Sequence, residues 1–155
     1  SSGFAYLFLV TDAYSRKIVG WSLAETLETS WSLAALGMAI KGAHAPLTGL
    51  IHHSDRGAQY CSSDYVNGLK SEGIEISMAE AGNPYENAIA ERVNGILKDE
   101  FLLDRTMEDT QTARRAVRQA VEAYNTLRPH RSIGLMKPEE KYRDPQTPEP
   151  RQEAA

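Results

Sequence analysis

Two apolar runs of strand length, separated by a short loop, constrain the fold more than any other feature of this sequence. Residues 4–10 and 17–23 are rich in aromatic and β-branched side chains, which favour extended strands. Residues 12–16 lie between them and have the length and composition of a hairpin loop. The sequence therefore predicts an antiparallel β-hairpin near the start of the chain.

The remainder of the chain mixes helical and strand periodicity. Apolar residues at helical spacing predict helices over about residues 30–41, 63–69, 87–103 and 109–127. Thr29 or Ser30 is the expected N-cap of the first helix, and Ser62 or Ser63 that of the second. Shorter apolar segments at residues 49–55 and 74–78 predict two more strands. This order predicts an α/β fold with one sheet and helices on its faces.

The composition suits a single domain. In 155 residues, 41% are hydrophobic and 25% are charged, which is enough apolar material to bury a core. We expect this domain to span residues 1–143. Residues 144–155 contain three prolines and no apolar cluster, so we expect them to form a disordered tail.

Charge and hydropathy exclude several classes of protein. The 17 Lys and Arg residues against 21 Asp and Glu give a formal net charge of −4, which argues against nucleic-acid binding by bulk charge but allows a local basic surface. The apolar segments are too short to cross a bilayer, and no positively charged signal-peptide start precedes them. The single cysteine, Cys61, cannot form an internal disulfide and is expected to be buried. We therefore expect a soluble cytoplasmic protein without a membrane partner.

The first candidate catalytic residue is Asp55, at the carboxyl end of the strand predicted over residues 49–55. Ligands of open α/β sheets bind at the carboxyl ends of strands, where side chains point into a crevice that loops surround. The alternative is a simple turn at residues 55–57, in which the aspartate bonds its own backbone. Asp55 alone does not distinguish these interpretations.

A second carboxylate, Glu91, follows Asp55 after thirty-five residues and lies in the first turns of the helix predicted over residues 87–103. At about 100° per residue, the apolar residues of this helix gather on one side, which we expect to face the core. The expected core-facing residues are Ile89, Val93 and Ile96, and the expected outward residues are Glu91, Asn94, Lys98 and, close to them, Asn87. An ordinary solvated helix face is the alternative that spacing does not exclude.

Asp55, the spacing of thirty-five residues, Glu91 and then Lys98 seven positions later resemble the second half of the D,D-35-E signature of retroviral-integrase-like recombinases. Four motifs in matching order strengthen the resemblance. They are VTDAYSRKIVGW at residues 10–21, HSDRG at 53–57, GNPYENA at 82–88, and YN at 124–125 with RPH at 128–130. Together, residues 4–142 look like the catalytic core of bacterial insertion-sequence transposases with an integrase-type domain.

This resemblance implies an RNase H-like mixed sheet flanked by helices, and metal-dependent phosphoryl transfer on DNA by 3′-end nicking and strand transfer. It implies that Asp55 and Glu91 are catalytic residues that ligate Mg²⁺ or Mn²⁺, hard cations that prefer carboxylate oxygens. Lys98 would contact DNA near the reacting phosphate. The other candidate DNA-binding residues are Asn87, Arg128, Arg131 and, at the rim of the site, His53. Because two DNA ends must be brought together, a homo-oligomer is expected.

The chain departs from the family pattern at its start. The family's first aspartate lies on a central strand that precedes the hairpin, and residues 1–11 contain no Asp or Glu. We therefore expect a core that lacks this first strand, binds metal weakly and catalyses poorly on its own. The gap in the sheet should be closed by direct strand pairing, by a shifted segment or by a second copy, because unpaired backbone is costly. Asp12 is expected to form a turn instead of replacing the missing ligand.

Other functions are weighed against the transposase interpretation. The main alternative is a catalytically inert DNA-binding or oligomerisation module derived from such a core. An RNase H-like nuclease is disfavoured by the motifs at residues 83–88 and 128–130. Zinc binding is disfavoured because the four histidines lack the spacing of a zinc site. Arg114, Arg115 and Arg118 are equally consistent with DNA contacts and with a solvated helix face.

Overall fold

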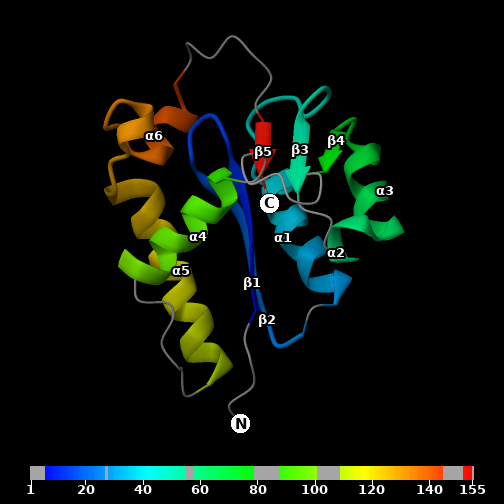
Figure 1. The fold of residues 1–155 in the computed structure, drawn as a ribbon, viewed down its shortest axis with the longest axis horizontal. Coiled ribbons are helices and arrows are strands. Elements are labelled where there is room, and N and C mark those ends of the chain that lie inside the picture. Colours follow the sequence, from blue (N-terminus) through cyan, green and yellow to red (C-terminus); the bar gives the residue numbers. More distant parts are fainter. Residues whose placement is uncertain are drawn as a thin grey trace.

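A five-stranded mixed sheet in the order β2-β1-β5-β3-β4 separates two groups of helices (Figure 1). Helices α1, α2 and α3 lie on one side of the sheet, and α4, α5 and α6 on the other. The computed structural model describes residues 6–26, 28–54, 58–78, 88–100, 109–144 and 152–154. The α/β class predicted from the sequence is confirmed.

The predicted hairpin is formed by β1 (Tyr6–Asp12) and β2 (Ile18–Ala24). The strands pair antiparallel from Tyr6 opposite Ala24 to Thr11 opposite Ile18, with an irregularity between Val10 and Thr11. Asp12 is buried, and its Oδ2 accepts hydrogen bonds from the Ser15 backbone N at 3.2 Å and from Ser15 Oγ at 2.6 Å. Asp12 is therefore a turn-forming residue, as its position predicts.

The other half of the sheet consists of β3 (Ile51–Ser54) and β4 (Glu75–Met78), which pair in parallel. They are joined by α2 (Ala58–Cys61) and α3 (Ser63–Ser71). The predicted cap of α3 is confirmed, since Ser62 Oγ accepts a hydrogen bond from the Tyr65 backbone N at 3.3 Å. The sequence does not predict α2, whose four residues are too few for a periodic pattern.

The two halves of the sheet are joined by β5 (Gln152–Ala154). It pairs antiparallel with β1 and parallel with β3. These three residues belong to the segment 144–155, for which the sequence predicts no regular structure. They lie at the central position, between the hairpin and β3, where the resemblance implies a gap.

Helix α1 (Thr29–Lys41) covers one face of the hairpin. Its N-cap is Glu28, so the prediction of Thr29 or Ser30 as the cap is wrong: the extended conformation ends at Glu28, and Thr29 is already helical. Gly20 on β2 allows the close approach of α1, because a Cβ there would lie 2.1 Å from the Ala35 carbonyl oxygen.

The opposite face of the hairpin is covered by α4 (Ala88–Glu100) and α5 (Thr110–Leu127). Asp109 caps α5 by accepting a hydrogen bond from the Thr112 backbone N at 2.7 Å. A 3₁₀ turn η1 (Arg131–Ile133) and α6 (Pro138–Tyr142) then fold back on the hairpin turn. The core between these helices and the sheet includes Leu9, Leu23, Val93, Ile96, Leu97, Val117, Val121 and the fully buried Tyr124. In the described ranges, no helix is both long and apolar enough to cross a membrane.

Candidate functional site

Helix α4 presents the outward stripe that its sequence predicts. Glu91, Asn94 and Lys98 are exposed, whereas Val93 and Ile96 are buried in the core. Glu91 lies in the first turn of the helix and Lys98 in its last turn. The helix therefore offers a carboxylate and an ammonium group to solvent on the same face.

Strand β3 carries two neighbouring histidines that point to opposite faces of the sheet. His52 is fully buried on the side of α3, where its Nε2 lies 2.9 Å from the Tyr65 hydroxyl. Burial lowers the pKa of His52 to about 4. His53 is half-buried and points to the other face, the side of the sheet on which α4 and α5 lie.

The predicted pairing of Asp55 with Glu91 stays a prediction. Strand β3 ends at Ser54, and Asp55 and Asn87 lie outside the described residues. Among the residues that the structure does describe, no group of three or more His, Cys, Asp or Glu side chains could hold a metal ion. In donor chemistry, Asp55 and Glu91 fit Mg²⁺ or Mn²⁺, since both are hard carboxylates and Glu91 is accessible on α4.

Two of the candidate DNA-binding residues follow α5. Arg128 forms a fork with Glu100 at the end of α4: its Nε and Nη2 donate hydrogen bonds to the two carboxylate oxygens at 2.5 and 2.7 Å. These bonds hold the pKa of Glu100 below its usual range. Arg131 is exposed in η1. The guanidinium of Arg128 is thus committed to joining two helices, whereas that of Arg131 faces solvent.

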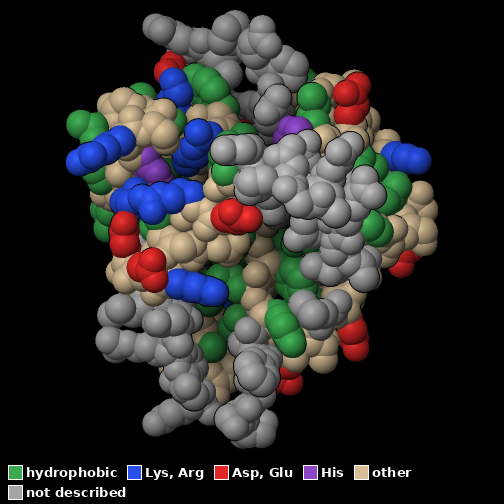
Figure 2. Space-filling view, viewed as in Figure 1, with side chains coloured by type: hydrophobic (Ala, Val, Ile, Leu, Met, Phe, Trp, Pro, Cys, Tyr) green, Lys and Arg blue, Asp and Glu red, His purple; other side chains and the backbone are tan. Residues whose placement is uncertain are grey.

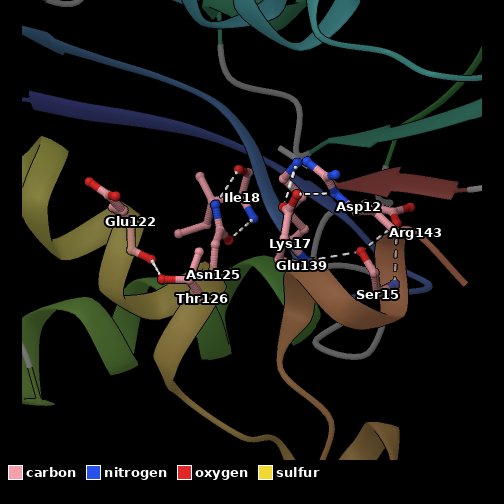
Figure 3. A network of polar contacts seen from close by, with 9 residues as sticks. All are labelled: Asp12, Ser15, Lys17, Ile18, Glu122, Asn125, Thr126, Glu139 and Arg143. Carbon is pink, nitrogen blue, oxygen red and sulfur yellow. Dashed lines mark hydrogen bonds and ion pairs between the residues drawn. The ribbon is translucent and has the colours of Figure 1, made fainter.

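The hairpin turn is held by residues whose role the sequence analysis missed (Figure 3). Asn125 Oδ1 accepts a hydrogen bond from the Ile18 backbone N at 2.9 Å, and its Nδ2 donates one to the Ile18 carbonyl at 3.0 Å. The Tyr124 hydroxyl donates to the Arg16 carbonyl at 2.7 Å. Asn125 itself could have indicated this role in the sequence, because its amide lies in line with the apolar face of the predicted helix. A polar group buried there needs a hydrogen-bond partner.

Helix α6 reinforces the same turn. Glu139 on α6 forms ion pairs with Lys17 at 2.8 Å and with Arg143 at 2.6 Å (Figure 3). The Lys17 ammonium also lies 4.2 Å from the centre of the Tyr142 ring. The turn beside α4 is therefore fixed by both α5 and α6.

His130, the last residue of the RPH motif, is buried against Tyr124, with the ring centres 5.0 Å apart. Its pKa is lowered to about 4 by burial first, and then by the positive charges of Arg128, Arg16 and Arg92. His130 is therefore neutral near pH 7.

Cys61 is exposed, so the prediction that it is buried is wrong. It ends the one-turn helix α2, in which Tyr60 takes the inward position. The Tyr60 ring packs edge-on against Tyr65 with the centres 5.4 Å apart. Because Tyr60 and Tyr65 fill this part of the core, the intervening Cys61 faces outward.

Comparisons with known proteins cover nearly the whole chain. The family described as integrase core domain matches residues 1–84, and a second family of the same description matches residues 72–138. A putative transposase for insertion sequence element IS986/IS6110 of Mycobacterium tuberculosis is 41% identical over 120 residues, which are 72% of this chain and 43% of that protein. The transposase InsF of Escherichia coli K12 is 34% identical over 139 residues, or 89% of this chain and 48% of that protein. The chain spans about half the length of the curated relatives that it matches.

Solved structures show the same fold at low sequence identity. A chain of the simian T-cell lymphotropic virus intasome has a TM-score of 0.77 at 20% identity, over 95% of this chain and 51% of that chain. The catalytic core domain of HTLV-2 integrase, solved in complex with magnesium, has a TM-score of 0.64 at 19% identity, over 90% of this chain and 93% of that chain. The mixed α/β structure described above therefore has the RNase H-like fold of integrase catalytic cores.

Proposed function

This chain belongs to the integrase core domain family of insertion-sequence transposases, and on that premise we propose that it carries the site for metal-dependent DNA nicking and strand transfer. The observation that carries the proposal is that α4, with Glu91 and Lys98 exposed on it, lies on the side of the sheet to which His53 of β3 points. Asp55 follows β3 directly, after Ser54. In this proposal, the carboxylate of Asp55 after β3 and that of Glu91 on α4 serve one reaction.

We assign the roles as follows. Asp55 and Glu91 would hold Mg²⁺ or Mn²⁺, which when bound supplies Lewis acidity at the phosphate. The Lys98 ammonium, exposed on the same stripe as Glu91, would bind a phosphate oxygen and so orient the DNA strand. His53, Arg131 and Asn87 would make further contacts around the site.

Arg128 differs from the other proposed DNA-binding residues because its guanidinium already binds a carboxylate of the chain. Its guanidinium already donates to both oxygens of Glu100, so contact with DNA would require that fork to open. We infer that Arg128 supports DNA binding mainly by fixing the end of α4 against α5. The expected working form is a homo-oligomer acting on DNA in the cytoplasm.

The test uses Mn²⁺-dependent nicking of duplex DNA. With two acidic ligands, we expect this chain alone to bind Mn²⁺ weakly in calorimetry and to nick poorly. A chain extended by the strand and aspartate that the family pattern places before the hairpin should nick, and Glu91→Gln should abolish nicking. The matched control is Glu72→Gln, which removes an exposed carboxylate at the end of α3, on the other side of the sheet.

The outcomes separate the candidate functions. Nicking that survives Glu91→Gln would overturn the assignment of Glu91. An extended chain that binds DNA and never nicks would favour the inert DNA-binding module. Preference for an RNA–DNA hybrid over duplex DNA would favour the RNase H-like nuclease.

A further inference from the structure

Three arginines from separate parts of the chain act electrostatically on the buried Tyr124–His130 pair. Arg16 lies in the hairpin turn, where its carbonyl accepts the Tyr124 hydroxyl at 2.7 Å. Arg92 is exposed on α4, and Arg128 follows the end of α5. The positive charges of all three act on both Tyr124 and His130, so the three arginines lie within electrostatic reach of this pair.

One of these three arginines forms an ion pair within the described part of the chain, and that arginine is Arg128. Glu100 is the carboxylate that acts on the same two rings, and both of its oxygens are taken by Arg128. In the described ranges, neither Arg16 nor Arg92 forms an ion pair. His130, held neutral, adds no charge, and its buried Nε2 has no hydrogen-bond partner among the described residues. Arg16 and Arg92 therefore have no ion-pair partner within the described ranges, so their guanidinium groups are available to an anion.

Hydrogen bonds hold the backbone of the turn that carries Arg16. Arg16 has a left-handed conformation, with φ at 65°, and the Tyr124 hydroxyl bond holds its carbonyl. The neighbouring Ile18 is held at both backbone groups by Asn125. Arg92 projects from α4 one residue after Glu91, about 100° around the helix.

We propose that Arg16 and Arg92 form a phosphate-binding site that holds the DNA backbone on the side of the molecule formed by α4, α5 and the hairpin turn. This inference rests on the proposed function and adds two residues to it. Guanidinium groups bind phosphate with paired hydrogen bonds, which gives both affinity and orientation. Lys and Arg side chains gather over α4, α5 and α6 on the left of the face in Figure 2, whereas fewer are seen over the helices on the right. A phosphate held by Arg92 would lie next to the Glu91 and Lys98 stripe.

The experiment measures how salt weakens binding of a fluorescent DNA duplex to the chain. Each phosphate contact contributes about 0.9 to the slope of log K against log salt concentration. The double variant Arg16→Gln with Arg92→Gln should therefore lower the slope by about 1.8, and Arg92→Gln alone by about 0.9. The matched control is Lys41→Gln with Lys70→Gln, which removes the same charge from exposed positions on α1 and α3 and should keep the wild-type slope.

A second measurement distinguishes failure of this site from failure of the proposed function. Inorganic phosphate is titrated into the wild-type chain while the Nε–Hε NMR signals of Arg16 and Arg92 are followed. DNA binding with an unchanged slope in the variants would overturn the site and leave the proposed function standing. Phosphate shifts at both arginines without DNA binding would support an anion site and count against the proposed function. If neither DNA nor phosphate binds, both ideas fail.

Folding of the variants is checked by thermal unfolding. Arg16→Gln retains the backbone carbonyl that accepts the Tyr124 hydroxyl, and Arg92 is exposed, so both variants should melt with the wild type. If the double variant is unstable, the salt dependence of DNA binding by Arg92→Gln alone tests the proposed site.

Discussion

Asn125 joins the carboxyl half of the chain to a turn 107 residues earlier through two hydrogen bonds to Ile18. We expect Asn125→Ala to leave both backbone groups of Ile18 without a partner in a buried position, and to lower the free energy of unfolding by about 2–4 kcal/mol. Urea denaturation checks this. Thr126→Ala is the control, because Thr126 is exposed on the next position of α5 and its loss should stay within about 0.5 kcal/mol. Equal losses in the two variants would contradict the role of Asn125.

Two buried histidines make stability depend on pH. The pKa of His52 and that of His130 are lowered from 6.5 to about 4, in both cases mainly by burial. Between pH 4 and pH 6.5, the unfolded chain therefore binds more protons than the folded chain. The stabilisation is complete above about pH 6.5 and is lost as the pH falls toward 4.

Each histidine should contribute up to about 1.4 kcal/mol per pH unit to this loss. Urea unfolding at a series of pH values checks the slope, since carboxylates add to it in the wild type. His52→Gln and His130→Gln should each flatten the dependence between pH 6.5 and 5 relative to the wild type. An equally steep dependence in both variants would show that these imidazoles do not cause it.

For single residues, the sequence predicts which face of a helix a side chain lies on better than it predicts which residue that side chain contacts. The helical period alone placed Val93 inside and Glu91 and Lys98 outside, because the period fixes which residues share a side. It did not reveal that Arg128 binds Glu100, since a contact across 28 residues depends on how α4 and α5 pack. The interpretation of Arg128 as a free DNA contact took no account of this partner.

Between elements, the closest contact is made where α1 crosses β2 at Gly20. A Cβ at this position would lie 2.1 Å from the Ala35 carbonyl oxygen and 3.2 Å from Ala39 Cβ. Gly20→Ala must therefore push α1 away from the sheet, and we expect a loss of about 1–3 kcal/mol or more. Gly37 on α1 has open space around its Cα, so Gly37→Ala should instead stabilise by about 0.5–1 kcal/mol. Thermal and urea unfolding of the two variants checks that their changes in stability have opposite signs. A Gly20→Ala variant as stable as the wild type would contradict this account of the packing.

The long elements were predictable because each carries a complete periodic pattern. The hairpin, α1 and α5 lie within a few residues of their predicted bounds, and Ser62, one of the two residues predicted to cap α3, does so. The short elements α2, η1 and α6 were not predicted, since three to five residues are too few to show a period. Helix α6 holds the hairpin turn through the ion pair of Glu139 with Lys17. This contact depends on how the helices pack and cannot be seen in the local sequence.

For the whole molecule, the order of strands matters more than their number. Local patterns predicted β1 with β2, and the parallel pair β3 and β4 follows from the helices that connect them. Nothing local indicates that residues 152–154 lie between the two pairs. The cost of unpaired backbone predicts that the gap is closed, but local sequence does not indicate which segment closes it, because closure depends on which backbone groups remain unpaired.

Strand β5 joins the β1–β2 pair and the β3–β4 pair into one sheet. A change in the backbone of β5 should therefore affect both pairs. Glu153 lies opposite Asp12 of β1 and opposite His52 of β3. Glu153→Pro removes one backbone N–H from this central strand, and the lost ladder hydrogen bond should cost about 1–3 kcal/mol. Hydrogen exchange should become faster near Asp12 and near His52 together, whereas the pairing of β1 with β2 around Leu7 and Leu23 should stay protected. Glu153→Ala keeps the N–H and serves as the control. Unchanged exchange in the proline variant would mean that β1 and β3 are held together by the helices on either side and not by the strand between them.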